Sequence, residues 1–130
     1  MIVGEPTRTQ AEAFDAMLAL QERAIETMGP GVPLAAVDLE VAALARELGQ
    51  ESRLRHHTGH AIGLEGHEAP FLDRGEEGAC EPGMVFTVEP GIYLRDVGGF
   101  RHSDTVCVTE SGCRVMTEYP RALADLVVGV

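Results

Sequence analysis

Lysine is absent from this sequence, and its absence goes with a strongly acidic balance of charge. All 10 of the lysine-or-arginine positions are arginines, against 21 acidic residues, which gives a formal net charge of −11. A surface of that sign repels nucleic acid and anionic membranes, so we expect neither as a partner. The sequence also lacks a signal-peptide pattern and any apolar run of about 18 residues, so we expect neither export nor a membrane-spanning segment.

Cysteine is scarce as well. Cys80, Cys107 and Cys113 are odd in number and have no CxxC spacing, which indicates reduced thiols and a cytoplasmic protein. At 130 residues and 45 % apolar content, the chain is of a size and composition to form one packed domain. Its opening "MIVGEP" is typical of a strand end that leads into a helix, so we expect residues 1–130 to form one partial domain.

The first part of the chain has the hydrophobic periodicity of two helices. Thr9 and Glu12 match a capping box, so we expect the first helix to begin there and to end before the "GPG" at 29–31. The second helix is expected over 34–48. The apolar stripes that should face a core are Phe14, Met17, Leu18, Ile25 and Met28 on the first helix, and Val37, Val41, Leu44 and Leu48 on the second.

Glycine becomes frequent after residue 59, and the helical periodicity disappears. "MVFTVEPGIYL" at 84–94 predicts a strand interrupted by Pro90, and 98–112 predicts a second strand paired antiparallel with the first. A last helical turn is expected near 120–127. Helices followed by strands predict an α+β fold, in which two helices pack on one face of an antiparallel, curved sheet.

Four of the five histidines lie in one short segment, "RHHTGHAIGLEGHEAPF" at 55–71. A single buried histidine is ordinarily structural, but four so close together indicate a functional site. Neutral imidazole is a strong ligand for divalent transition metals, and glutamate oxygens suit the harder ions of that series. The spacing is not the HExxH of a zinc-protease helix, and Gly59 and Gly63 on either side of His60 favour an extended or looped backbone.

Glu89 is a second candidate for this site. In an extended strand, Val85, Thr87 and Glu89 share one face, opposite Phe86 and Val88. A carboxylate in an otherwise apolar strand is costly unless it is paired or bound to a metal, so both a salt bridge with an arginine and a metal site remain open. By the same alternation, Arg101, Ser103 and Thr105 share a face of the next strand.

Three motifs, "HHTGHAIGLEGHEAP", "EPGMVFTVEPGIY" and "GGFRHSDTVCVTESG", resemble in order and spacing those of the Xaa-Pro dipeptidase (prolidase) and Xaa-Pro aminopeptidase group. This group belongs to the pita-bread metallopeptidase family shared with creatinase and methionine aminopeptidase. The resemblance covers nearly the whole chain. It implies the C-terminal part of a pita-bread fold and, in intact relatives, hydrolysis of the bond before proline in short peptides.

The resemblance also implies roles for individual residues. His60 and Glu89 match metal ligands of the family, which binds Mn, Co or Zn. His67, beside Glu68, matches the substrate-contacting histidine, and His56 a proton-shuttle or substrate-contact position. Tyr93 and Arg101 match positions that support the ligands. His57 matches no role, and we expect it to face solvent.

Two departures from the family pattern weaken this reading. Ser103 stands where the family has a glutamate that bridges two metals, and Asp104 beside it should point to the opposite face. Two aspartate ligands of the family would lie upstream of this chain. Two remaining protein ligands hold a divalent metal poorly, so we expect weak or no metal binding.

Three functions therefore remain open. The first is a metallopeptidase that binds a short proline-containing peptide. The second is a non-catalytic peptide-binding or regulatory protein with a decayed metal site, and the third is a creatinase-like hydrolase of a small non-peptide substrate. If the upstream segment is missing, a strand edge is left unpaired. We therefore expect a homodimer, or pairing of that edge with the missing segment.

Overall fold

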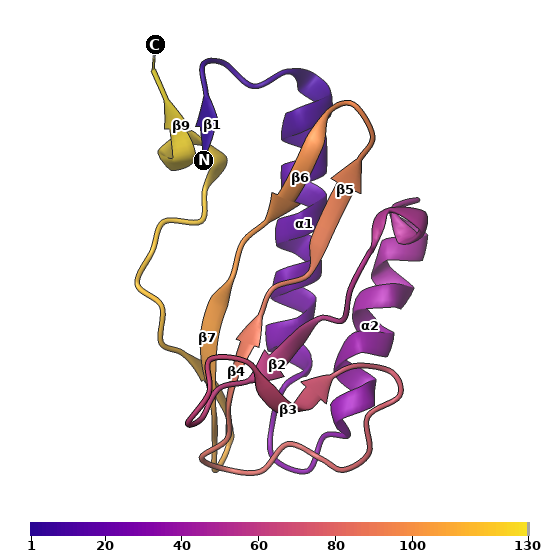
Figure 1. The fold of residues 1–130 in the computed structure, drawn as a ribbon, viewed down its shortest axis with the longest axis vertical. Helices are drawn as coiled ribbons and strands as arrows, with labels where there is room; N and C mark the ends of the chain where they lie inside the picture. Colours follow the sequence, from indigo (N-terminus) through magenta and orange to yellow (C-terminus); the bar gives the residue numbers. More distant parts are fainter. Residues whose placement is uncertain (130) are drawn as a thin grey trace.

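A computed structural model describes residues 1–129 and has the predicted α+β composition (Figure 1). Helix α1 spans Arg8–Thr27 and helix α2 spans Leu34–Glu47, with short 3-10 turns at η1 (Glu51–Arg53) and η2 (Leu123–Leu126). The strands are β1 (Ile2–Val3), β2 (Gly59–Ala61), β3 (Glu68–Leu72), β4 (Val85–Val88), β5 (Gly91–Leu94), β6 (Gly98–Arg101), β7 (Asp104–Thr109), β8 (Gly112–Val115) and β9 (Val127–Val128).

The strands form a five-stranded antiparallel sheet and two smaller pairs. The sheet order is β3-β2-β4-β7-β8, while β5 pairs antiparallel with β6 and β1 pairs parallel with β9. The pairings Val88↔Asp104 and Gly91↔Arg101 show that β4–β5 and β6–β7 are the two sides of one interrupted ribbon. The predicted antiparallel pairing is therefore confirmed, but the parallel β1–β9 pair was not predicted.

The ribbon is interrupted at the same level on both sides. Pro90 has no N–H to give to a ladder, which accounts for the expected break between β4 and β5. Opposite it, His102 and Ser103 separate β6 from β7, so the single strand predicted over 98–112 was wrong. Gln21 of α1 closes this gap: its wholly buried side-chain amide donates to the carbonyls of Val88 (3.1 Å) and His102 (2.9 Å).

The start of α1 differs from the predicted capping box at Thr9 and Glu12. Thr7 is the N-cap: its hydroxyl accepts from the N–H of Gln10, whose side-chain oxygen accepts in turn from the N–H of Thr7. Thr7 has an extended backbone (φ −67°, ψ 159°) directly after Pro6, so the helix starts two residues earlier. Glu12 instead pairs with Arg8 one turn before it.

Both helices lie on one side of the strands, as predicted, with α1 along the ribbon and α2 beside β3 (Figure 1). Of the predicted stripe residues, Phe14, Met17 and Met28 of the first helical segment and Val37 and Val41 of the second are buried, whereas Leu48 is 42 % exposed. Neither helix within residues 1–129 has the length and apolarity that crossing a bilayer requires.

Gly59 lies where β2 comes closest to the ribbon, so a side chain there has no space. A Cβ at Gly59 would come within 1.9 Å of the backbone oxygen of Thr87, whereas a Cβ at Gly66 would meet nothing within 4 Å. We expect Gly59→Ala to lower the free energy of unfolding by about 2–4 kcal/mol, because the strands must move apart. Gly66→Ala, the matched control, should change it by less than about 0.5 kcal/mol. Urea unfolding of both variants measures this, and equal stabilities would contradict the close approach.

Candidate metal and peptide site

The histidines of the 55–71 segment are brought together by the β2–β3 pair. His60 lies in β2, and His67 directly precedes β3, whose antiparallel register shifts between His60 and Ala61. The His60 and His67 ring centroids are 4.0 Å apart, and the His57 ring is 5.8 Å from that of His67. The extended backbone predicted around His60 is thus present.

A buried threonine fixes this segment to the rest of the fold. Thr58 is 1 % exposed, and both its N–H and its hydroxyl donate to Asp38 Oδ1 of α2, at 3.1 and 2.7 Å. The other Asp38 oxygen accepts from Arg74 Nε at 3.2 Å. The carbonyl of Thr58 accepts from the N–H of Glu89 at 2.8 Å, so one residue connects α2, the histidine segment and the ribbon.

His60 and Glu89 face each other across β2 and the end of β4, as the strand alternation and the family resemblance together predict. Their Nε2 and Oε1 atoms are 3.2 Å apart, and both side chains are at most 15 % exposed. His60 Nδ1 lies 3.0 Å from the carbonyl oxygen of Ala61, which can only accept, so this nitrogen carries the proton that it donates. Nε2 then either carries a second proton, which it donates to the carboxylate, or presents a lone pair, in which case a cation must lie between the two acceptors.

The pair has the chemistry of a cation site but few ligands. Histidine ligands commonly donate their second ring N–H to a backbone carbonyl, as His60 does to Ala61. The other oxygen of Glu89 lies 3.7 Å from Arg101 Nη1, so this carboxylate is also near the arginine expected to support it. Among residues 1–129, no group of three or more His, Cys, Asp or Glu side chains could hold a metal ion.

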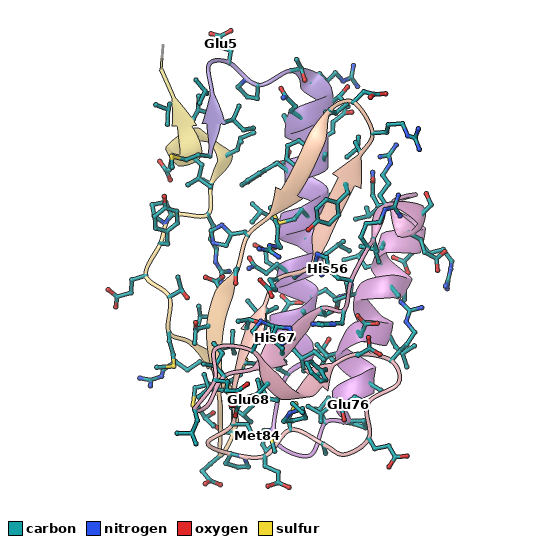
Figure 2. The ribbon with its side chains drawn as sticks, viewed as in Figure 1. Glu5, His56, His67, Glu68, Glu76 and Met84 are labelled. Atoms are coloured by element: carbon teal, nitrogen blue, oxygen red, sulfur yellow. The ribbon has the colours of Figure 1, made fainter. Side chains whose placement is uncertain are left out.

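His56 and Tyr93 form a second pair at the edge of the site. Tyr93 O–H lies 2.8 Å from His56 Nε2, and His56 Nδ1 lies 2.8 Å from the carbonyl of His57. Because that carbonyl takes the Nδ1 proton, Nε2 accepts from the tyrosine hydroxyl. Two glycines leave space for the Tyr93 ring, because a Cβ at Gly91 or Gly99 would come within 2.9 Å of that ring. Figure 2 shows His56 above His67 in this view.

Two of the predicted site residues point elsewhere. The Glu68 carboxylate accepts from the N–H of Glu65 at 2.8 Å and so closes the 63–65 loop. Ser103 lines a separate cavity of about 330 Å³ together with Arg101 and His102. Asp104 does point to the opposite face, as predicted: it is buried there and paired with Arg121.

A cavity of about 340 Å³ opens beside the histidines and was not predicted from the sequence. It is lined by His57, His67, Phe71, Asp73, Gly75 and Glu76. His57, which was expected to face solvent, is partly exposed at this cavity, with its ring 5.3 Å from that of Phe71. The only signal in the sequence was the position of these residues directly around the "HEAP" motif, since their convergence depends on the conformation of the loop after β3.

Comparison with known proteins agrees with the motifs. The model of metallopeptidase family M24 matches residues 1–110. The chain belongs to metallopeptidase family M24. It is 37 % identical over 123 residues to an Xaa-Pro dipeptidase of Pyrococcus furiosus. The matched region covers 95 % of this chain and 35 % of the dipeptidase. The family description implies a divalent metal in intact members.

Solved structures of a dipeptidase and a prolidase superpose closely on this M24 chain. Dipeptidase PepE from Mycobacterium ulcerans superposes with a TM-score of 0.92 and 36 % identity, over 98 % of this chain and 34 % of that one. The prolidase from Pyrococcus horikoshii superposes with a TM-score of 0.91 and 35 % identity, over 95 % and 35 %. The predicted pita-bread fold is confirmed. The M24 chain spans about a third of the length of these relatives.

His57 should titrate below its usual range in the folded M24 chain. Burial lowers the pKa of His57 from 6.5, and the neighbouring histidines lower it further, while Asp73 acts in the opposite direction. The unfolded chain therefore binds a proton that the folded chain does not, so the contribution of His57 to stability falls as pH drops through 6.5. Its C2–H NMR resonance, assigned with a His57→Asn variant, should have a midpoint below that of the urea-unfolded chain. A folded midpoint at or above 6.5 would contradict this.

Proposed function

We propose that this M24 chain supplies metal- and substrate-binding residues for hydrolysis of the bond before proline in short peptides. The approach of His60 Nε2 to Glu89 Oε1 at 3.2 Å, beside the His67 ring, supports this proposal most strongly. The 37 % identity of the chain to a protein named Xaa-Pro dipeptidase supports the choice of substrate. A Mn, Co or Zn ion held by His60 and Glu89 would supply Lewis acidity toward the peptide carbonyl.

The other residues would bind and orient the peptide. His67 lies against His60 on one side and lines the 340 Å³ cavity on the other, so it would contact the substrate beside the reacting carbonyl. The Tyr93 hydroxyl donates a hydrogen bond to His56 Nε2, and this bond keeps both side chains at the edge of the site. Arg101 balances the charge of Glu89, and Glu68 would act indirectly by shaping the loop before His67.

A non-catalytic peptide-binding member of the family is the second candidate. The presence of Ser103 in place of the bridging glutamate favours it, because a neutral hydroxyl is a poor substitute for a carboxylate between two cations. The lack of any three-ligand group in the described part of the chain, residues 1–129, favours it as well. Metal affinity and turnover separate the two candidates.

We expect the isolated chain to bind Mn, Co or Zn weakly, in the micromolar range or above, because two protein ligands, and no third, converge within residues 1–129. Glu89→Gln should abolish the residual binding, since it removes the charged ligand. Glu81→Gln, at an exposed position, is the matched control and should leave binding unchanged. Calorimetry at neutral pH measures this. Submicromolar affinity in the unmodified chain would mean that further groups had been recruited.

We also expect no metal-dependent cleavage of Gly-Pro by the isolated chain, and no rescue by Ser103→Glu. That substitution adds one carboxylate and should tighten metal binding a few fold, but a hydrolytic metal needs a complete and rigid set of ligands. The assay uses both chains with added Mn. Turnover by the unmodified chain would refute this account of its ligands.

Light scattering on the same samples tests the expected self-association. Within residues 1–129, β6 pairs only with β5, so its outer edge offers unpaired backbone groups to a second copy. We expect dimers or larger species, and a stable monomer would count against an edge that recruits a partner.

A further inference from the structure

The 340 Å³ cavity beside the histidines has one acidic end. Asp73 and Glu76 line it together with His67, and both are partly buried. Its volume is within the range of about 300–1,000 Å³ that is usual for small-ligand pockets. Figure 2 shows Glu76 on the loop that follows β3, beyond His67.

Both carboxylates are held in place by backbone groups. Asp73 Oδ1 accepts from the N–H of Gly75 at 2.9 Å, and Glu76 Oε2 accepts from the N–H of Phe71 at 2.9 Å. Each group thereby has one oxygen held, while the second oxygen forms no hydrogen bond within residues 1–129. No ion pair involves either of them in the part of the chain that the structure describes, residues 1–129.

The nearest arginine in sequence does not neutralise this end of the cavity. Arg74 lies between the two carboxylates in the chain, but its Nε donates to Asp38 Oδ2 at 3.2 Å. Arg74 and Arg55 line a neighbouring cavity that Asp73 also borders, but among residues 1–129 neither arginine forms an ion pair with Asp73. The negative charge of Asp73 and Glu76 is therefore left without a protein cation among the residues that line the 340 Å³ cavity.

The walls of the cavity are aromatic. The Phe71 ring lies 5.3 Å from the His57 ring and 5.6 Å from the His67 ring. Aromatic faces attract cations, and the planar guanidinium group stacks on them especially well. An aromatic wall that leads to two oriented carboxylates matches a side chain with an apolar stem and a positively charged head.

We propose that this cavity is a subsite for a positively charged side chain, so that the preferred substrates are short peptides with arginine or lysine next to the scissile bond. This inference rests on the proposed function, because His67 both lines the cavity and lies 4.0 Å from His60. A peptide whose carbonyl lies beside His60 and Glu89 can thus extend past His67 toward Asp73 and Glu76.

The test compares Arg-Pro with citrullyl-Pro, which has nearly the same shape and no charge, in calorimetric binding to the full chain. We expect Arg-Pro to bind about tenfold more tightly. Asp73→Asn and Glu76→Gln retain the oxygens that accept from Gly75 and Phe71, so both variants should fold and lose most of that preference. Glu77→Gln is the matched control, because it removes the same charge at an exposed neighbour outside the cavity.

Agmatine, a guanidinium compound without a peptide bond, separates this inference from the proposed function. If agmatine binds and Glu76→Gln weakens that binding while Glu77→Gln does not, the cationic subsite stands even if no dipeptide is cleaved. Equal affinities for Arg-Pro and citrullyl-Pro would overturn the inference. So would a preference that Glu77→Gln reduces as much as Glu76→Gln does, or the failure of a folded chain to bind any guanidinium ligand.

Discussion

The hydrogen bonds of Thr58 hold together the parts on which the candidate site depends. Its N–H and hydroxyl bind a carboxylate of α2, and its carbonyl receives the N–H of Glu89. His60 lies two residues after Thr58, in β2. His60 and Glu89, whose side chains approach to 3.2 Å, therefore belong to segments that Thr58 holds together, and a buried network of this kind is rigid only while every member is satisfied.

The ribbon break gives the site its second constraint. Glu89 lies where Pro90 interrupts the ladder, so its side chain is placed at the end of a strand rather than within a continuous sheet. The carbonyls on both sides of the break would be buried without partners, a costly state that the amide of Gln21 prevents. Gln21, which is far from the histidines in the sequence, thus allows β4 to end inside the protein just before Glu89.

Much of this arrangement follows from local patterns in the sequence. The alternation in 84–89 gave the face of Glu89, because side chains alternate strictly along a strand, and the resemblance to the metallopeptidase family placed His60 beside it. The start of α1 was predicted two residues too late, because Thr9 and Glu12 match a capping box just as Thr7 and Gln10 do, and the structure uses the earlier pair. The cavity formed by Phe71, Asp73 and Glu76 depends on how one loop folds back, and no periodicity encodes that.

The pairing of Asp104 with Arg121 has a consequence for how the chain matures. Asp104 is fully enclosed in β7, and leaving such a charge without its partner is strongly unfavourable. During synthesis, β7 emerges from the ribosome before Arg121 does, so Asp104 gains this counter-charge only after residue 121 has been translated. We therefore expect the central sheet to reach its full stability only then, and proteolytic clipping between 116 and 121 to destabilise the whole sheet.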